Sequence, residues 1–174
     1  MMPGMPEQPN KWIFDTVVVS NFIFSDALSL LKKRYRSKGI ITSEVHGELL
    51  AGVGKYPNLT QVNRLFVDKI FELKYLSEKE RAACEQLLSF LGLGEASTIV
   101  YAHNHNGVVV TDDQAARNQC KRINIPVTGT IGILKACALN TLVTIEEADD
   151  ILRKMMLAGF YSPVKSMKDI ILNP

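Results

Sequence analysis

Apolar and polar positions follow a repeating pattern along this chain, in which short apolar runs rich in β-branched residues alternate with longer stretches of helical spacing. Short apolar runs bounded by turn residues are typical of buried strands. The pattern predicts strands at Trp12–Val19, Gly39–Thr42, Val108–Thr111 and Ile125–Thr128. The run Phe66–Leu73 suits either a strand or a helix.

Helical spacing fills most of the chain between these runs, with a Gly- and Pro-containing loop over Gly52–Thr60. Two helices are expected to begin at capping boxes, Ser77–Glu80 and Thr144–Glu147, and the second is expected to end at Gly159. The remaining predicted helices are Ser25–Arg36, Ser43–Ala51, Glu95–Ala102, Asp112–Arg122 and Gly132–Leu139. Strands that alternate with helices predict an α/β fold, a three-layer α/β/α arrangement with a mainly parallel central sheet.

Length and composition favour one domain inside the cell. The chain has 174 residues, and after a Pro-rich start we expect residues 1–10 to form a flexible tail and residues 11–174 a single domain. The three cysteines include no C-x-x-C pair, which disfavours a disulfide framework or a zinc site. The start lacks the charged and apolar regions of a signal peptide, and no apolar run reaches about 18 residues. We therefore expect a soluble, cytoplasmic protein without a membrane partner.

Charge is nearly balanced overall but concentrated in one segment. With 20 basic and 18 acidic residues the net charge is +2, which by itself predicts no nucleic-acid partner. One interpretation of the basic segment 32–38 is a track for a phosphate backbone. The other is a solvated helix end, where cations complement the helix dipole before Gly39. The side chains concerned are Lys32, Lys33, Arg34 and Arg36.

Acidic residues recur where an apolar run gives way to a turn or helix, at Asp15, Glu48, Glu95, Asp112 and Asp113. In an open parallel sheet, such positions converge beyond the carboxyl ends of the strands. Taken singly, an aspartate here is explained as a helix cap and a glutamate as a helix residue. Taken together, the carboxylates predict a hard-oxygen site for Mg²⁺ or Mn²⁺, and hence a metal-dependent nuclease.

Five segments of the chain resemble motifs of PIN-domain proteins. Asp15–Phe22 resembles the opening D-T-x-x-x-x-N-hydrophobic motif, and Ile41–Leu49 the hydrophobic-P-x-x-V-x-x-E-L pattern. Leu93–Ala102 is similar to the G-E-A-x-x-I-x-x-A helix of one PIN-like branch. Val110–Arg117 resembles its D-D-x-x-A-R segment, and Val127–Leu134 its V-x-G-T-x-G-x-L segment. The five occur in the family's order and span most of the chain.

This resemblance implies a metal-dependent endoribonuclease of the kind found as the toxin of toxin–antitoxin pairs. It implies RNA as substrate, Mg²⁺ or Mn²⁺ as cofactor, a small antitoxin protein as partner, and a homodimer. The implied catalytic residues are Asp15, Glu48, Glu95 and Asp113. The implied metal ligands are Asp15, Glu95, Asp112 and Asp113, of which Asp113 fits the family's T-x-D position better than Asp112 does.

Polar neighbours of the acids complete the expected site. Thr16, Ser20 and Asn21 are expected to supply hydrogen bonds, and Thr130, ahead of a helix, to offer its hydroxyl and free amides to a phosphate. The chain departs from the family pattern at Thr42, where proline is usual. Many catalytic members carry aspartate where this chain has Glu95, and the extra methylene changes the reach of the carboxylate.

Two other functions remain open at the level of sequence. A PIN-like module that binds nucleic acid or protein without cleaving it would keep the same carboxylates. A phosphatase with an early aspartate nucleophile would resemble D-x-D-x-T, but this chain has Val17 at the second acidic position.

Overall fold

A parallel sheet of five strands organises the molecule. The computed structural model describes residues 11–172, apart from the side chain of residue 68. The strands lie in the order β3-β2-β1-β4-β5, and every neighbouring pair is parallel. They are β1 (Trp12–Phe14), β2 (Gly39–Thr42), β3 (Phe71–Lys74), β4 (Val108–Val110) and β5 (Val127–Thr128). The predicted parallel α/β sheet is confirmed, and the undecided run Phe66–Leu73 contributes the edge strand β3.

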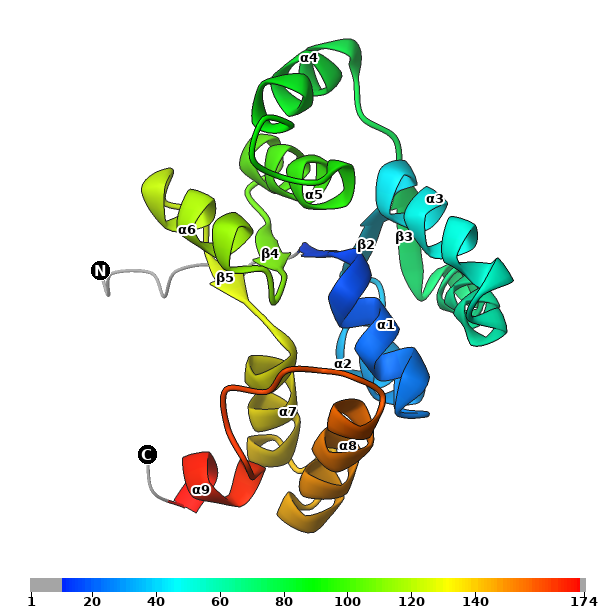
Figure 1. Cartoon of the computed structure of the whole chain (residues 1–174), viewed down its shortest axis with the longest axis vertical. Helices are drawn as coiled ribbons and strands as arrows, with labels where there is room; N and C mark the ends of the chain where they lie inside the picture. Colours follow the sequence, from blue (N-terminus) through cyan, green and yellow to red (C-terminus); the bar gives the residue numbers. More distant parts are fainter. Residues whose placement is uncertain (1–10, 173–174) are drawn as a thin grey trace, which may run out of the picture.

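Helices cover both faces of this sheet (Figure 1). Those between the strands are α1 (Thr16–Phe24), α2 (Leu28–Arg34), α3 (Ser43–Ala51), α4 (Glu78–Leu87), α5 (Leu93–Asn104) and α6 (Gln114–Arg122). The chain closes with α7 (Thr130–Leu139), α8 (Ile145–Leu157) and α9 (Met167–Leu172). Short 3₁₀ helices η1 (Gly52–Gly54), η2 (Pro57–Leu65) and η3 (Val67–Lys69) join α3 to β3. The expected loop over Gly52–Thr60 is therefore partly helical.

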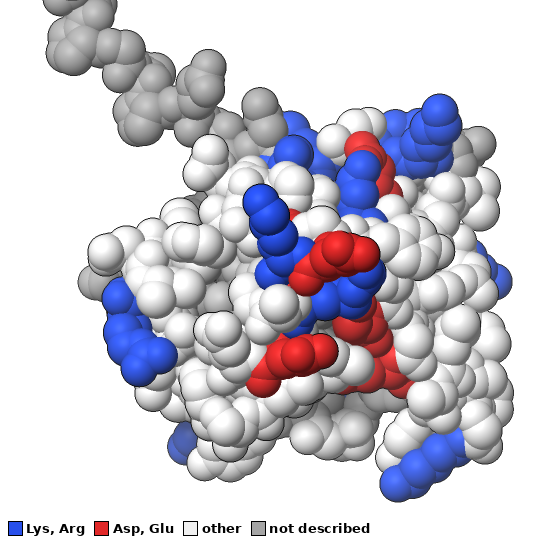
Figure 2. Space-filling view, turned by 90° about the horizontal axis from the view of Figure 1, so that it is seen from above, with Lys and Arg blue, Asp and Glu red and all other residues white. Residues whose placement is uncertain are grey.

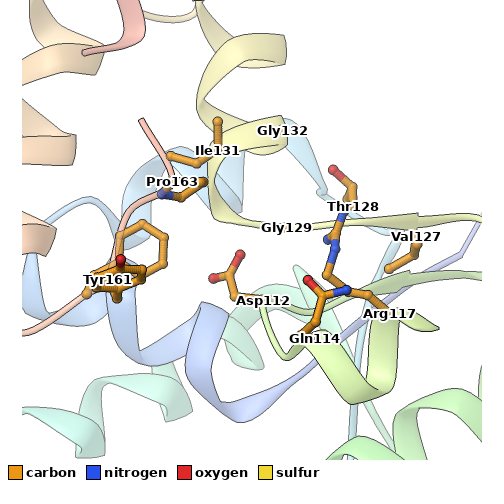
Figure 3. A pocket seen from close by; sticks show the side chains of 11 residues that line it. Asp112, Gln114, Arg117, Val127, Thr128, Gly129, Ile131, Gly132, Tyr161 and Pro163 are labelled. Atoms are coloured by element: carbon orange, nitrogen blue, oxygen red, sulfur yellow. The ribbon is translucent and has the colours of Figure 1, made fainter. Parts of the chain in front are cut away.

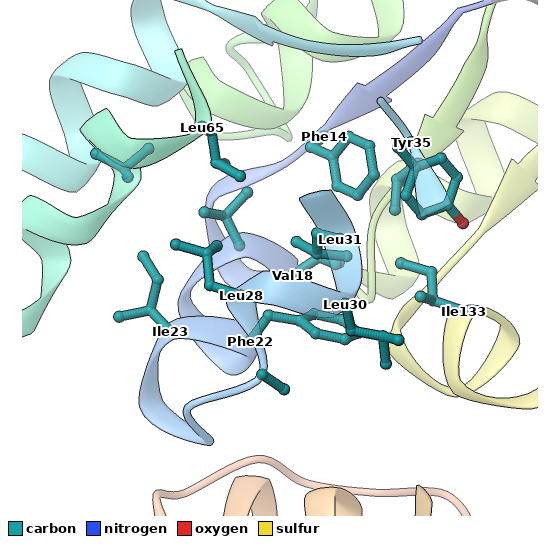
Figure 4. Packing of buried hydrophobic residues seen from close by; sticks show 14 of the residues in the cluster. Phe14, Val18, Phe22, Ile23, Leu28, Leu30, Leu31, Tyr35, Leu65 and Ile133 are labelled. Carbon is teal, nitrogen blue, oxygen red and sulfur yellow. The ribbon is translucent and has the colours of Figure 1, made fainter. Parts of the chain in front are cut away.

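Successive residues of each central strand enter different cores, because side chains alternate across a sheet. Phe14, Ile41 and Val110 pack on the face covered by α1, α2, α7 and α8. Their neighbours on the same strands, such as Ile13 and Val109, pack on the face covered by α5 and α6. Figure 4 shows the first core, where Phe14 and Tyr35 meet the apolar side chains of α1 and α2. The three-layer α/β/α prediction is confirmed.

The first predicted strand was too long. The strand ends at Phe14, and Thr16–Phe24 forms α1, with Asp15 as the N-cap whose Oδ1 accepts a hydrogen bond from the Thr16 amide at 2.7 Å. The run of valines suggested a strand because β-branched residues have high strand propensity. Packing overrides that propensity, since the helix buries Val18 and Val19 completely. The acid therefore lies after a strand, not inside it.

Other predicted boundaries shift by a turn or less. The predicted helix Ser25–Arg36 is shorter, because Asp26 has a φ of 58° and separates α1 from α2. Both capping boxes are present, at Ser77 and at Thr144, and they begin α4 and α8 as predicted. The predicted tail, residues 1–10, lies outside the described residues. Within residues 11–172 no helix is both long and apolar enough to cross a bilayer.

Candidate functional site

Asp15 is a buried carboxylate at the carboxyl end of the central strand β1. Its side chain has no exposed surface, and Oδ2 accepts a hydrogen bond from the Thr111 hydroxyl at 2.8 Å. Burial, followed by the negative charges of Glu95 and Glu48, raises the pKa of Asp15 from 3.8 to about 7, against the opposing effect of its hydrogen bonds. Burial first, and neighbouring carboxylates second, therefore disfavour the charged form of this group.

Glu48 reaches the same edge from α3 and joins two helices there. Its Oε1 accepts a hydrogen bond from the Gly94 amide in the first turn of α5 at 2.8 Å, and its Oε2 accepts one from the Thr16 hydroxyl in α1. A Cβ at position 94 would lie 2.3 Å from Oε2, so this approach requires glycine. Both carboxylate oxygens are thereby fixed, which suits a residue that positions other groups.

Glu95 and Asp113 face an open cavity of about 500 Å³ in front of Asp15. The Glu95 carboxylate forms no hydrogen bond or ion pair with any described residue, while Asp113 caps α6 through Oδ1, which accepts from the Ala116 amide at 2.7 Å. Ser20 also lines this cavity and donates its hydroxyl hydrogen to the Thr16 carbonyl at 2.8 Å. Asp15 does not line the cavity and lies behind its wall.

Asp112 holds the start of α7 and accepts three hydrogen bonds. Oδ1 accepts from the Thr130 amide at 2.8 Å, while Oδ2 accepts from the Thr130 hydroxyl at 2.5 Å and from Nδ2 of Asn21 at 3.2 Å. Thr130 is completely buried by this network. The hydroxyl and amide of Thr130, which were expected to face a phosphate, thus donate to Asp112 in this structure.

The Thr111 hydroxyl connects Asp15 to Asp113, a role that the sequence did not predict. It donates to Asp15 and accepts from the Asp113 amide at 3.2 Å, so one buried side chain contacts the residues that follow β1 and β4. The T-x-D spacing of Thr111 and Asp113 was the available signal. That spacing indicates only that Asp113 fits the family's T-x-D position.

Thr42 stands where proline is usual in the family, and its hydroxyl is buried. It caps α3 by accepting from the Val45 amide at 3.3 Å, and it shares a hydrogen bond of 2.8 Å with the Ser97 hydroxyl of α5. Proline has no group that could do either. The departure from the family pattern is thus matched by a bridge between α3 and α5.

The basic segment 32–38 lies toward the amino ends of the strands. Helix α2 returns the chain to the amino end of β2, and the Lys38 carbonyl accepts from the amide of Trp12, the first residue of β1. The five acids instead follow or face the carboxyl ends of the strands. The structure therefore does not bring the basic side chains of residues 32–36 to the carboxylates. Figure 2, which views the α4 side, shows that charges of both signs mingle on that face.

The chemistry of this edge suits a hard cation, but the donors do not form a closed cage. No acid among Asp15, Glu48, Glu95, Asp112 and Asp113 forms an ion pair with a described lysine, arginine or histidine. Within the described part of the chain, no group of three or more His, Cys, Asp or Glu side chains is arranged to hold a metal. Excess negative charge without a cationic partner is a property of metal-ligand sets. Glu95 and Asp113 are the members with a carboxylate oxygen free to accept one.

Comparisons with known proteins agree with the fold. The model of the DUF3368 family, described as a PIN domain, matches residues 11–173. A chain from the crystal structure of VapBC2 from Rickettsia felis bound to a DNA fragment from their promoter superposes with a TM-score of 0.50 and 20% identity. The match covers 68% of this chain and 97% of that chain. No curated protein matches the sequence.

Proposed function

Because this chain belongs to the PIN-domain family, we propose that it is an endoribonuclease that hydrolyses RNA phosphodiester bonds with Mg²⁺ or Mn²⁺ at the carboxyl edge of its sheet. The observation that carries this proposal is the environment of Asp15. A completely buried carboxylate faces two further carboxylates and no basic partner among the described residues. Such an arrangement costs stability unless a cation joins it.

The residues divide into ligands and supports. Glu95 and Asp113, which line the cavity, and Asp15 behind them would hold the metal. A divalent cation bound there would polarise the phosphodiester and activate a water molecule. Glu48 positions the first turns of α1 and α5, and thereby Glu95, through its bonds to Thr16 and Gly94. Thr111 orients Asp15 and Asp113, as outer partners of ligands commonly do.

Asp112 contributes through the position of α7. Its carboxylate already accepts three hydrogen bonds, so we assign it to holding α7 against Asn21 and not to direct metal coordination. Asp112 also forms part of the wall of the cavity, so its hydrogen bonds help to hold that wall in place.

Partners and compartment are proposed from the family. The related crystal structure contains VapBC2 with promoter DNA, and by analogy we propose a small antitoxin protein as a partner of this chain. We also propose a homodimer, from the resemblance to the family, and a cytoplasmic location, from the sequence.

The test measures cleavage of structured and single-stranded RNAs by the purified protein with Mn²⁺, Mg²⁺ or EDTA. We expect metal-dependent cleavage that Asp15→Asn lowers by more than about 100-fold, since loss of even an outer partner of a metal ligand costs 10- to 100-fold. The matched control is Asp26→Asn at an exposed residue with a φ of 58°, a conformation that asparagine accepts. Cleavage that survives Asp15→Asn, or that EDTA does not stop, would contradict the proposal.

A second function, a binding module without turnover, is favoured by one observation. Most carboxylate oxygens of the five acids already have partners within the protein, and the described residues contain no preformed cage. A folded protein that binds Mn²⁺ in calorimetry and binds RNA without cutting it would establish this alternative.

A further inference from the structure

A second cavity continues from the carboxylate cavity across Asp112. Its volume is about 620 Å³, and the two cavities share Asp112, Phe160 and Tyr161 as lining residues. Figure 3 shows the Asp112 carboxylate between Tyr161 on one side and Gln114 and Arg117 on the other. Volumes of this size are typical of sites for small molecules. The catalytic proposal uses only the first cavity and leaves this one without a role.

The backbone that leads into Tyr161 is held in place, and its ring is exposed. Helix α8 ends in a Schellman motif, in which Gly159 has a φ of 107° and the Phe160 amide donates to the Met155 carbonyl at 3.0 Å. Tyr161 follows immediately and is 94% exposed, the largest value among the exposed large apolar and aromatic side chains of the described residues. An aromatic side chain on an anchored backbone loses little backbone entropy when a partner stacks on its ring.

Hydrogen bonds fasten the segment that follows Tyr161. Ser162 accepts from the Val164 amide at 3.2 Å, and Asp149 of α8 accepts from the Ser166 hydroxyl at 3.3 Å and from the Met167 amide. The segment 158–166 is therefore tied to α8 at both ends. These bonds anchor the backbone that carries Tyr161, which lines the cavity together with Asp112.

Arg117 supplies a cation on the far side of the cavity. Its Nη1 donates to the Thr111 carbonyl at 2.9 Å, and the guanidinium forms no ion pair with a described residue. A guanidinium anchored by one hydrogen bond keeps other donors for a phosphate. A phosphate would lie at this end, because the Asp112 carboxylate repels it from the middle.

We propose that this second cavity binds a nucleotide of single-stranded RNA next to the cleaved bond, with an unpaired base stacked on Tyr161 and a phosphate at Arg117. The proposal rests on the proposed function and adds the substrate class. A base inside a duplex has both faces covered by its neighbours, so an exposed ring at a groove selects bases that are unstacked. The site thus favours single strands or loops over paired RNA.

The experiment measures binding without cleavage. Fluorescence anisotropy in EDTA follows a labelled single-stranded RNA, the same sequence as a duplex, and an oligomer of the same length with abasic residues. The protein variants are Tyr161→Ala, Tyr161→Phe and the control Tyr75→Ala, a tyrosine that is 72% exposed and lines neither cavity. Thermal unfolding first confirms that all variants are folded.

We expect Tyr161→Ala to weaken binding of the single strand by about 5- to 100-fold, the range found when a stacking aromatic is lost. Tyr161→Phe and Tyr75→Ala should stay within about threefold of the unsubstituted protein, and the duplex and abasic oligomers should not respond to Tyr161→Ala. Arg117→Gln should lower the slope of log affinity against log salt by about one, which Tyr161→Ala should not do.

Three results would overturn the proposal: unchanged binding of the single strand by Tyr161→Ala, equal losses for Tyr161→Ala and Tyr75→Ala, or a loss that persists with the abasic oligomer. Absence of RNA binding by the unsubstituted protein would do the same. Failure of the nuclease proposal is separate. Binding through Tyr161 without cleavage in Mn²⁺ would leave this site standing, and metal-dependent cleavage with an unchanged KM in Tyr161→Ala would refute the site and keep the nuclease.

Discussion

Asp15 and Asp112 follow neighbouring strands of one sheet and meet opposite surroundings. Asp112 accepts three hydrogen bonds from Thr130 and Asn21, so its negative charge is matched by protein donors. Asp15 accepts one from Thr16 and one from Thr111, and otherwise faces Glu95 and Glu48. The first arrangement stabilises the fold, and the second is costly without a cation. Carboxylates at one edge of a sheet can therefore serve different ends.

The largest effect on stability is expected from Asp112→Ala. The substitution leaves the Thr130 hydroxyl and the Asn21 amide without their acceptor and removes a helix cap, which together cost about 2–4 kcal/mol. The thermal unfolding midpoint should fall by roughly 5–15 °C. A midpoint within about 1 °C of the unsubstituted protein would show that Asp112 is not structural, and would remove the contrast with Asp15.

Asp15→Asn should act in the opposite direction in EDTA. Its raised pKa means that the folded state binds the proton more tightly than the unfolded chain, so the contribution of Asp15 to stability is greatest at low pH and is lost as the pH rises from about 4 to about 7. The uncharged amide of asparagine does not ionise, so the variant does not lose this stability as the pH rises. The variant should be more stable at pH 8, by an amount on the order of 2 kcal/mol, and the gain should vanish near pH 4.

Added Mn²⁺ sharpens the same comparison. It should raise the unfolding midpoint of the unsubstituted protein but not of Asp15→Asn, because only a protein that binds the ion gains by mass action. A variant that is less stable than the unsubstituted protein at pH 8 in EDTA would refute the view that Asp15 is held at a cost.

Two glycine substitutions test whether Glu48 supports the site by contact. Gly94→Ala would place a Cβ 2.3 Å from Glu48 Oε2, and we expect it to lower cleavage about tenfold. The control, Gly47→Ala in α3, has no atom within 4 Å of the added Cβ and should stabilise the helix by about 0.5–1 kcal/mol without loss of activity. Equal cleavage by the two variants would show that the contact between Glu48 and Gly94 is dispensable.

The smallest effect is expected from the double substitution Lys32→Gln and Lys33→Gln. These lysines lie in α2, which returns the chain to the amino edge of the sheet, so cleavage of a short RNA should change by less than about threefold. The rate is measured at about 0.15 M salt, where screening suppresses distant charges. A tenfold loss would mean that RNA wraps around the sheet from one edge to the other.

The sequence alone determined the layered α/β fold and the order of its acids. The short, continuously apolar strands, the two capping boxes and the succession of strand, acid and helix are local signals, and the structure contains each of them. The strand Trp12–Val19 failed because valine favours strands locally while the core required a helix there. Asp15 before Thr16 was the N-cap signal that would have corrected it.

Only the tertiary structure decided which atoms meet. Gly94 and Arg117 make contacts that spacing in the sequence does not encode, such as the hydrogen bond between Gly94 of α5 and Glu48 of α3. In the structure the Thr130 hydroxyl donates to Asp112, and the basic segment lies toward the amino ends of the strands, away from the acids. The physical reason is that periodicity fixes the face of an element on which a side chain lies. Its partner and its charge environment depend on how separate elements pack.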